Sequence, residues 1–317
     1  MAENRGQESG RGRESKRPGQ IPRRGWRDIL LRTWGQIGQD NVGLVAAGVA
    51  FYGLLGLFPA IAALVSIYGL IADPAQVQQQ VQTMSGVMPE ELHRILGEQM
   101  GEVAASGARA LSIAVVGSLA LALWSASKGT KTLMTAMNVA YNEDERRNFL
   151  VLNLTALGLT AFFILLFVAA LVAVVFAPAL LAALGVGRPI AMLGWPLIIA
   201  VLLVALAILY RFGPSREQAK WRWISPGSIA AVVLWLAASV AFSTYVRNFG
   251  SYNETYGSLG AVVGLMMWLW ISAFIVVMGA ELNAESERQT RRDTTTGDPR
   301  PMGERGAYVA DTVGERP

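Results

Sequence analysis

The chain has 317 residues, of which 53% are hydrophobic and only 16% are charged, and its formal net charge is +4. Soluble domains carry about a quarter charged residues, so this balance argues against a soluble globular protein and favours an integral membrane protein. The sequence has no cysteine and a single histidine, His93, which excludes disulfides and cysteine- or histidine-rich metal centres. No cofactor is expected. Basic residues flank apolar runs, as in membrane proteins, so they do not indicate nucleic-acid binding.

Polar segments lie at both ends of the chain. Residues 1–25 have almost no large apolar side chains and bury too little surface to offset chain entropy, which predicts a disordered basic cytoplasmic tail. Residues 286–317 are predicted to be a second disordered cytoplasmic tail. Residues 26–40 repeat apolar side chains at helical spacing, which predicts an amphipathic helix at the cytoplasmic headgroups. No cleavable signal peptide is expected before the first apolar run.

Six uncharged runs follow, and each is long enough, or nearly so, to cross a bilayer as a helix. They cover residues 42–72, 110–127, 149–187, 189–210, 223–246 and 255–280. The second run is the shortest, and its helix is expected to continue past Lys128, whose side chain can reach back to the interface. The sequence therefore predicts an all-α fold, a polytopic membrane helix bundle in which residues 26–285 form six transmembrane helices.

The distribution of basic residues predicts the direction of the spans. With six spans and both termini cytoplasmic, the cytoplasmic segments hold all but four of the 27 Lys and Arg residues. Dividing the long third run into two spans would place the basic segment 211–222 outside, against the positive-inside rule. One long helix is therefore predicted there. The largest external segment, 73–110, is acidic and is predicted to form two short amphipathic helices on the outer surface.

Two further patterns predict contacts of the bundle. Small residues four positions apart favour close packing between membrane helices, and they occur as Ala46 with Ala50 and as Gly260 with Gly264. A basic and aromatic segment follows the fourth span. Such a mixture can stack on nucleic-acid bases, but at the end of a span it is interpreted as a belt on anionic lipid, formed by Arg211, Trp221, Arg222 and Trp223.

The second span carries a polar stripe that includes Ser125, Lys128, Thr132 and Asn138. Two interpretations are open: a cytoplasm-facing cavity that attracts anionic groups, or a helix leaving the bilayer whose lysines reach the phosphates. The turn before the sixth span is either a packed turn or part of an outward gate, and its candidate residues are Tyr252, Asn253 and Tyr256. Glu281 is expected to pair with Lys128, Lys131 or Arg211.

No catalytic arrangement is evident, and no enzyme activity is expected. The acidic run 143–147 is interpreted as a solvated charge run, because a two-metal nuclease needs ligands that converge from several segments. No serine belongs to a nucleophile–histidine motif, and Walker and Rossmann loops are absent from the sequence.

Several segments, in order, resemble the YihY/virulence factor BrkB family. They are Asp40-Asn41 with the following AAGVAFYGLLGLFPAIAAL, WSASKG at 124–129, Asn138 with Tyr141, RFGPSREQAKWRWISPG at 211–227, FGSYNETYGSLG at 249–260 and GAELN at 279–283. The resemblance covers about residues 26–285 and implies a six-helix protein of the bacterial inner membrane. Members have carried the label ribonuclease BN, which these residues do not support, and transport or envelope-lipid roles have been suggested for the family.

The leading prediction is therefore a multi-pass transporter or exporter of an anionic or lipid-like molecule in the bacterial cytoplasmic membrane. The alternative is a non-transporting envelope protein that organises lipids or partner proteins through its small-residue faces. The expected partners are membrane lipids with anionic headgroups and further copies of the chain, and not nucleic acid.

Overall fold

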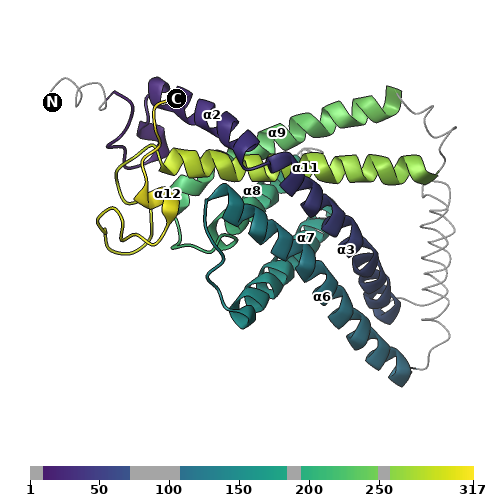
Figure 1. The fold of residues 1–317 in the computed structure, drawn as a ribbon. Helices are drawn as coiled ribbons and strands as arrows, with labels where there is room; N and C mark the ends of the chain where they lie inside the picture. The colour runs from purple at the N-terminus through teal and green to yellow at the C-terminus, as the bar shows by residue number, and fades with distance from the viewer. Residues whose placement is uncertain (1–9, 72–107, 184–193, 249–257) are drawn as a thin grey trace.

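The structure, a computed structural model, describes residues 10–71, 108–183, 194–248 and 258–317 (Figure 1). Within these ranges the regular elements are helices, together with an isolated β-bridge between Ala219 and Thr295. They are η1 (Pro18–Gln20), α2 (Arg23–Gln39), α3 (Val42–Ile71), α6 (Ala108–Ala140), α7 (Phe149–Ala183), α8 (Gly194–Phe212), α9 (Trp221–Asn248), α11 (Ser258–Glu287) and α12 (Tyr308–Asp311). The predicted external helices before residue 108 and the turn with Tyr252, Asn253 and Tyr256 lie outside the described residues.

Each predicted apolar run corresponds to one helix. Helix α7 is continuous from Phe149 to Ala183, which confirms one long helix, and α6 continues past Lys128 to Ala140. In the described parts of the chain, three helices are long and apolar enough to cross a bilayer: Phe149–Ala170, Trp221–Val246 and Val262–Glu287. Two shorter apolar helices are Val42–Gly56 and Pro196–Phe212. The chain is thus an all-helical membrane protein.

The helices converge at one end and diverge toward the other (Figure 1). Helices α3 and α6 pack along each other, as do α9 and α11, and the two pairs separate away from the end that carries both termini. We call the shared end the polar base and define it as residues 10–40, 141–148, 213–220 and 288–317. Away from it, apolar side chains such as Leu165, Val240 and Val263 are more than 60% exposed, as expected for helices whose surroundings are hydrocarbon.

The best-packed part of the bundle lies next to the polar base. Its buried side chains come from α3, α6, α8, α9 and α11, and they include Val42, Met137, Tyr141, Leu209, Tyr210, Ile224, Val277 and Ala280. Ala46 and Ala50 are also buried, at 0% and 2% exposure. Small side chains on α3 therefore do lie in a close-packed region.

The closest contact between α9 and α11 involves other glycines than those predicted. A Cβ at Gly264 would meet no atom within 4 Å, whereas one at Gly227 would overlap the carbonyl oxygen of Gly279. Pro226 lacks an N–H, and the N–H of Gly227 donates to Asn283 Oδ1 at 2.7 Å. This bond joins α9 to the side chain of Asn283 on α11 at the crossing. Gly264 therefore has open space around it, and the packing role predicted for Gly260 stays a prediction, because spacing alone does not report where helices cross.

The terminal segments also differ from the predicted disordered tails. Residues 10–25 and 288–317 pack against each other and against the end of α11: the N–H of Arg291 donates to the carbonyl of Arg13 at 2.8 Å, and Arg13 Nη2 donates to the carbonyl of Gly314 at 2.7 Å. Ile21 and Val309 are buried. The prediction counted apolar residues, but polar contacts between the two distant segments contribute most of this packing.

Candidate anion-binding pocket

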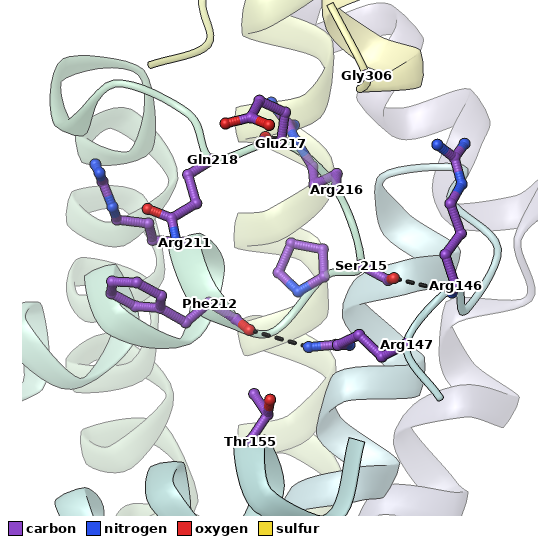
Figure 2. A pocket seen from close by; sticks show the side chains of 11 residues that line it. Arg146, Arg147, Thr155, Arg211, Phe212, Ser215, Arg216, Glu217, Gln218 and Gly306 are labelled. Carbon is purple, nitrogen blue, oxygen red and sulfur yellow. Dashed lines mark hydrogen bonds between the residues drawn. The ribbon is translucent and has the colours of Figure 1, made fainter. Parts of the chain in front are cut away.

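A pocket of about 550 Å³ opens in the polar base where the loops after α6 and α8 meet (Figure 2). We call it the arginine pocket because four of its lining side chains are arginines. It is lined by Arg146, Arg147, Thr155, Arg211, Phe212, Pro214, Ser215, Arg216, Glu217, Gln218 and Gly306. These residues come from four regions of the chain, so the site exists only in the folded bundle.

Two loops are joined at the floor of the pocket. The side chain of Asn138, at the end of α6, accepts a hydrogen bond from the N–H of Ser215 at 2.7 Å and donates to Glu145 at 3.0 Å. The Ser215 hydroxyl accepts from the N–H of Arg146 at 3.0 Å. At Gly213, a Cβ would lie 2.5 Å from the carbonyl oxygen of Leu209, so only glycine fits this close turn. These contacts place the arginines of both loops around one space.

The C-terminal segment forms the outer rim. The N–H of Glu217 donates to the carbonyl of Gly306 at 3.0 Å, and the N–H of Lys220 donates to the carbonyl of Thr294 at 2.8 Å. The N–H of Thr296 returns a bond to the carbonyl of Gln218 at 2.8 Å. The segment after α11 is thus part of the candidate site.

Two of the four arginines form close ion pairs with carboxylates. Arg216 makes a two-pronged contact with Glu287, at 2.8 and 3.1 Å, and both side chains are almost fully buried. Its guanidinium also lies 4.9 Å from the centre of the Tyr141 ring. Arg147 binds both oxygens of Glu145 at 2.7 Å and donates to the carbonyl of Gly213 at 2.8 Å. These two ion pairs fix the loops that line the pocket.

The other two arginines have unused binding capacity. Arg211 stacks on Trp221, 4.3 Å from the ring centre, and donates from Nη1 to the carbonyl of Ala219 at 2.8 Å. Its Nε is buried without a hydrogen-bond partner, and among the described residues no carboxylate forms a salt bridge with it. The side chain of Arg146 is 65% exposed, and its contact with a carboxylate is long, at 3.4 Å between Nη2 and Glu143 Oε2. Figure 2 shows these two arginines on opposite sides of the pocket.

Glu145, the carboxylate partner of Arg147, stays ionised near neutral pH. Burial works against its charge, but hydrogen bonds from Arg147 and Asn138 outweigh burial and lower the pKa of Glu145 to about 2. Burial also disfavours the charge of Arg216, yet the adjacent Glu287 raises the pKa of Arg216 above its ordinary value. Among the described residues, the positive charge without a carboxylate partner in this pocket is that of Arg211, and exposed Arg146 has only the long contact with Glu143.

The polar stripe of the second span does not line the arginine pocket. Lys128 is exposed, on the side of α6 away from α3 and α7, and Ser125 and Thr132 are half-buried. Contacts of Gly129 with Tyr52 and of Thr130 with Thr160 mark the sides that face the neighbours. Asn138 is buried and joins the two loops instead. The two interpretations of the stripe, a cavity or a helix leaving the bilayer, both stay predictions.

The predicted lipid belt is divided in the structure. Trp221 is 50% exposed and Arg222 is exposed, whereas Trp223 is only 1% exposed and packs with Ile21 and Ile29. Trp223 therefore does not face lipid, because α2 and the N-terminal segment cover it. The prediction that Glu281 pairs with a lysine or Arg211 is also wrong: the group within hydrogen-bonding range of Glu281 is the carboxyl of Asp40.

Sequence reasoning missed Arg146 and Arg147 as pocket residues. It treated 143–147 as a solvated charge run, although Glu143 is 7% exposed and accepts from the N–H of Tyr308 at 2.6 Å. A usable signal was present, since two adjacent arginines just before an apolar helix sit where anionic headgroups lie.

Comparison with known proteins decides the family. The family model described as Virulence factor BrkB matches residues 33–303, most of the chain. The chain belongs to the virulence factor BrkB family. This BrkB-family chain is 30% identical over 253 residues to the ribonuclease-like protein YfkH of Bacillus subtilis, covering 75% of this chain and 88% of that protein. The family resemblance of the sequence motifs is thereby confirmed.

Other relatives of this BrkB-family chain are named UPF0761 membrane proteins. The one from Tolumonas auensis is 33% identical over 79 residues, which is 25% of this chain and 26% of the relative. The one from Idiomarina loihiensis is 31% identical over 93 residues, covering 29% and 32%. The chain thus matches about a third or less of these proteins' length. No solved structure matches the chain.

Proposed function

We propose that this BrkB-family protein binds phosphate-bearing, lipid-like anions in the arginine pocket and transports them across the bacterial cytoplasmic membrane. The observation that carries the proposal is Arg211, whose buried Nε has no partner and whose charge is not balanced by a carboxylate among the described residues. A buried donor without a partner is costly, and a bound anion would satisfy it. Guanidinium groups match phosphate oxygens in geometry and charge.

The position of the pocket supports a ligand that comes from the membrane surface. Arg211 is in the last turn of α8, stacked on Trp221, which is half exposed at the start of α9. Tryptophan and arginine at the end of a span mark the headgroup region. A volume of about 550 Å³ lies within the range of pockets that hold small molecules. A phosphate headgroup therefore fits, with its acyl chains left in the bilayer.

The topology in this proposal has six spans, α3, α6, α7, α8, α9 and α11, with the polar base in the cytoplasm. The basic residues support it, because all but four of the 27 Lys and Arg lie in the segments that this arrangement places inside. The arginine pocket would then open to the cytoplasm, where an exported molecule is loaded.

The second candidate function is a scaffold that holds anionic lipid or partner proteins without moving them. It is favoured by the polar stripe, since Lys128 is exposed on α6 and does not line the arginine pocket. Both candidates require anion binding at Arg211. They differ in whether the bound molecule crosses the membrane.

Anion binding is tested with purified protein in a detergent with a neutral headgroup. We expect short-chain phosphatidic acid to bind more tightly than short-chain phosphatidylcholine, because its phosphate is unscreened by a cation. Arg211→Gln should weaken phosphatidic acid binding about tenfold, the effect of losing one charged hydrogen bond. The dissociation constant can be followed by native mass spectrometry, with inorganic phosphate as a separate arm that distinguishes a free anion from a lipid.

Arg222→Gln is the matched control, because Arg222 is an exposed arginine near the same membrane boundary and does not line the pocket. Its binding constant should change by less than about twofold. Equal affinity for the two lipids, or unchanged binding in Arg211→Gln, would contradict the proposal.

A further inference from the structure

Two carboxyl groups meet where the end of α2 contacts α11. Asp40 follows the last residue of α2, and Asn41, with a φ of 49°, turns the chain in the left-handed conformation into α3. Asparagine tolerates this conformation better than most residues. Glu281 lies on α11 and is 1% exposed. The two side chains are within hydrogen-bonding range of each other.

Among the described residues, three of the four carboxyl oxygens of this pair lack a hydrogen-bond donor. Both oxygens of Glu281 and Oδ2 of Asp40 are buried without a hydrogen-bond partner. The neighbouring glutamates of α11 differ: Glu285 is bound by Arg32 and Arg288, and Glu287 is bound by Arg216. Glu281 is thus a fully buried acid that faces a second acid in place of a cation.

The charged surroundings do not balance two negative charges. From α11, Glu285 adds negative charge and Arg288 adds positive charge, but Arg288 is paired with Glu285 at 2.6 Å. Just after α6, the buried hydroxyl of Tyr141 has no hydrogen-bond partner and lies close enough to interact electrostatically with Glu281. Two buried carboxylates within hydrogen-bonding range of each other cannot both ionise. One shared proton removes their repulsion and donates a hydrogen bond to the unpaired carboxyl oxygens.

We propose that Asp40 and Glu281 form a proton-binding site that holds one proton between the two carboxyl groups at neutral pH. Asp40 is half-buried, so the site has a route to water at the polar base. The pKa of Asp40 is raised, mainly by burial and also by the charge of Glu285, against the opposing effects of Glu281 and Arg288. Anion binding at Arg211 neither requires this proton nor follows from it.

Infrared spectroscopy of the purified protein at pH 7 tests the site directly. The wild type should show the C=O stretching band of a protonated carboxylic acid. Glu281→Gln should remove it, because the new amide donates to the half-buried Asp40 carboxylate and lets it ionise. Asp40→Asn should shift the band without removing it, because Glu281 stays buried and protonated but loses its carboxylate partner. Glu14→Gln, which changes a glutamate that is 61% exposed, should keep the band. A wild type without the band, or a band that persists in Glu281→Gln, would overturn the proposal.

A series of melting temperatures at different pH values gives a second, independent measurement. A carboxyl with a raised pKa holds its proton in the folded state, so its contribution is complete below the ordinary value of 3.8 and is lost as pH rises through the folded pKa. The wild-type melting temperature should therefore fall between pH 5 and pH 8. Buried Glu143 gives a slope of the same sign, so the decisive result is the comparison with Glu281→Gln.

At pH 8 Glu281→Gln should melt about 3 °C above the wild type, and the gap should close at pH 5. A variant that melts below the wild type by the same amount at both pH values would show that Glu281 has only a packing role and would overturn the proposal.

Discussion

Gly227→Ala should leave little correctly folded protein. The added Cβ would overlap the carbonyl oxygen of Gly279 and lie 2.6 Å from the Asn283 side chain. The carbonyl is backbone, so α9 and α11 would have to separate at their closest contact, which would also break the bond from Gly227 N–H to Asn283. Overpacking of this kind costs about 3 kcal/mol or more. We expect the apparent melting temperature in detergent to fall by about 10 °C, with most of the protein aggregated in size-exclusion chromatography.

Gly264→Ala is the matched control, since it adds the same methyl group to a glycine of α11 that has open space around it. Its melting temperature should stay within about 2 °C of the wild type. If the two variants were equally stable, the contact between α9 and α11 would have to lie elsewhere.

Glu287→Met, at the end of α11 next to the polar base, should be among the most damaging single changes in the chain. It leaves the guanidinium of Arg216, whose side chain is 2% exposed, without its carboxylate, and it removes the acceptor that Thr294 binds at 2.6 Å. Breaking a buried ion pair by removing one partner costs about 3–5 kcal/mol, because the other charge stays buried. The melting temperature should fall by about 10 °C or more.

The double variant Arg216→Met with Glu287→Met shows whether the loss of stability comes from an unpaired buried charge or from lost packing. Removing both charges should recover at least about half of the lost stability. Arg292→Gln is the comparison for an exposed pair, because Arg292 and Glu14 are both more than half exposed, and it should have almost no effect. A double variant less stable than Glu287→Met would contradict the buried-charge explanation.

The membrane helices could be predicted because their signal is local. Uncharged runs of about 20 residues have one stable form in a bilayer, so the start of α7 and the extension of α6 followed from residue type. The choice of one long helix for α7 also used the distribution of basic residues. The crossing at Gly227 and Gly279 could not, because it depends on Pro226 and on Asn283, which lies 56 residues further along the chain than Gly227. Trp223 was placed at the lipid surface for the same reason, since nothing near it in sequence shows that α2 covers it.

The arginine pocket was the least predictable feature. Arg211 was identified as a headgroup residue, but its proximity to Arg146 depends on the bond between Asn138 and Ser215, 77 residues apart. The rim depends on the segment after α11, whose polar composition predicted disorder. Glu281 was noticed, but a partner of opposite charge was expected, because a buried pair of acids is rare unless a proton or ion is shared.

Lipid transfer in reconstituted vesicles shows directly whether the arginine pocket loads an anionic lipid for transport. Vesicles with a fluorescent phosphatidic acid in one leaflet should transfer it faster with the wild-type protein than without protein. Arg211→Gln should slow the transfer about fivefold or more, and Arg222→Gln should not. Transfer no faster than in protein-free vesicles, despite binding at Arg211, would contradict transport and favour the scaffold.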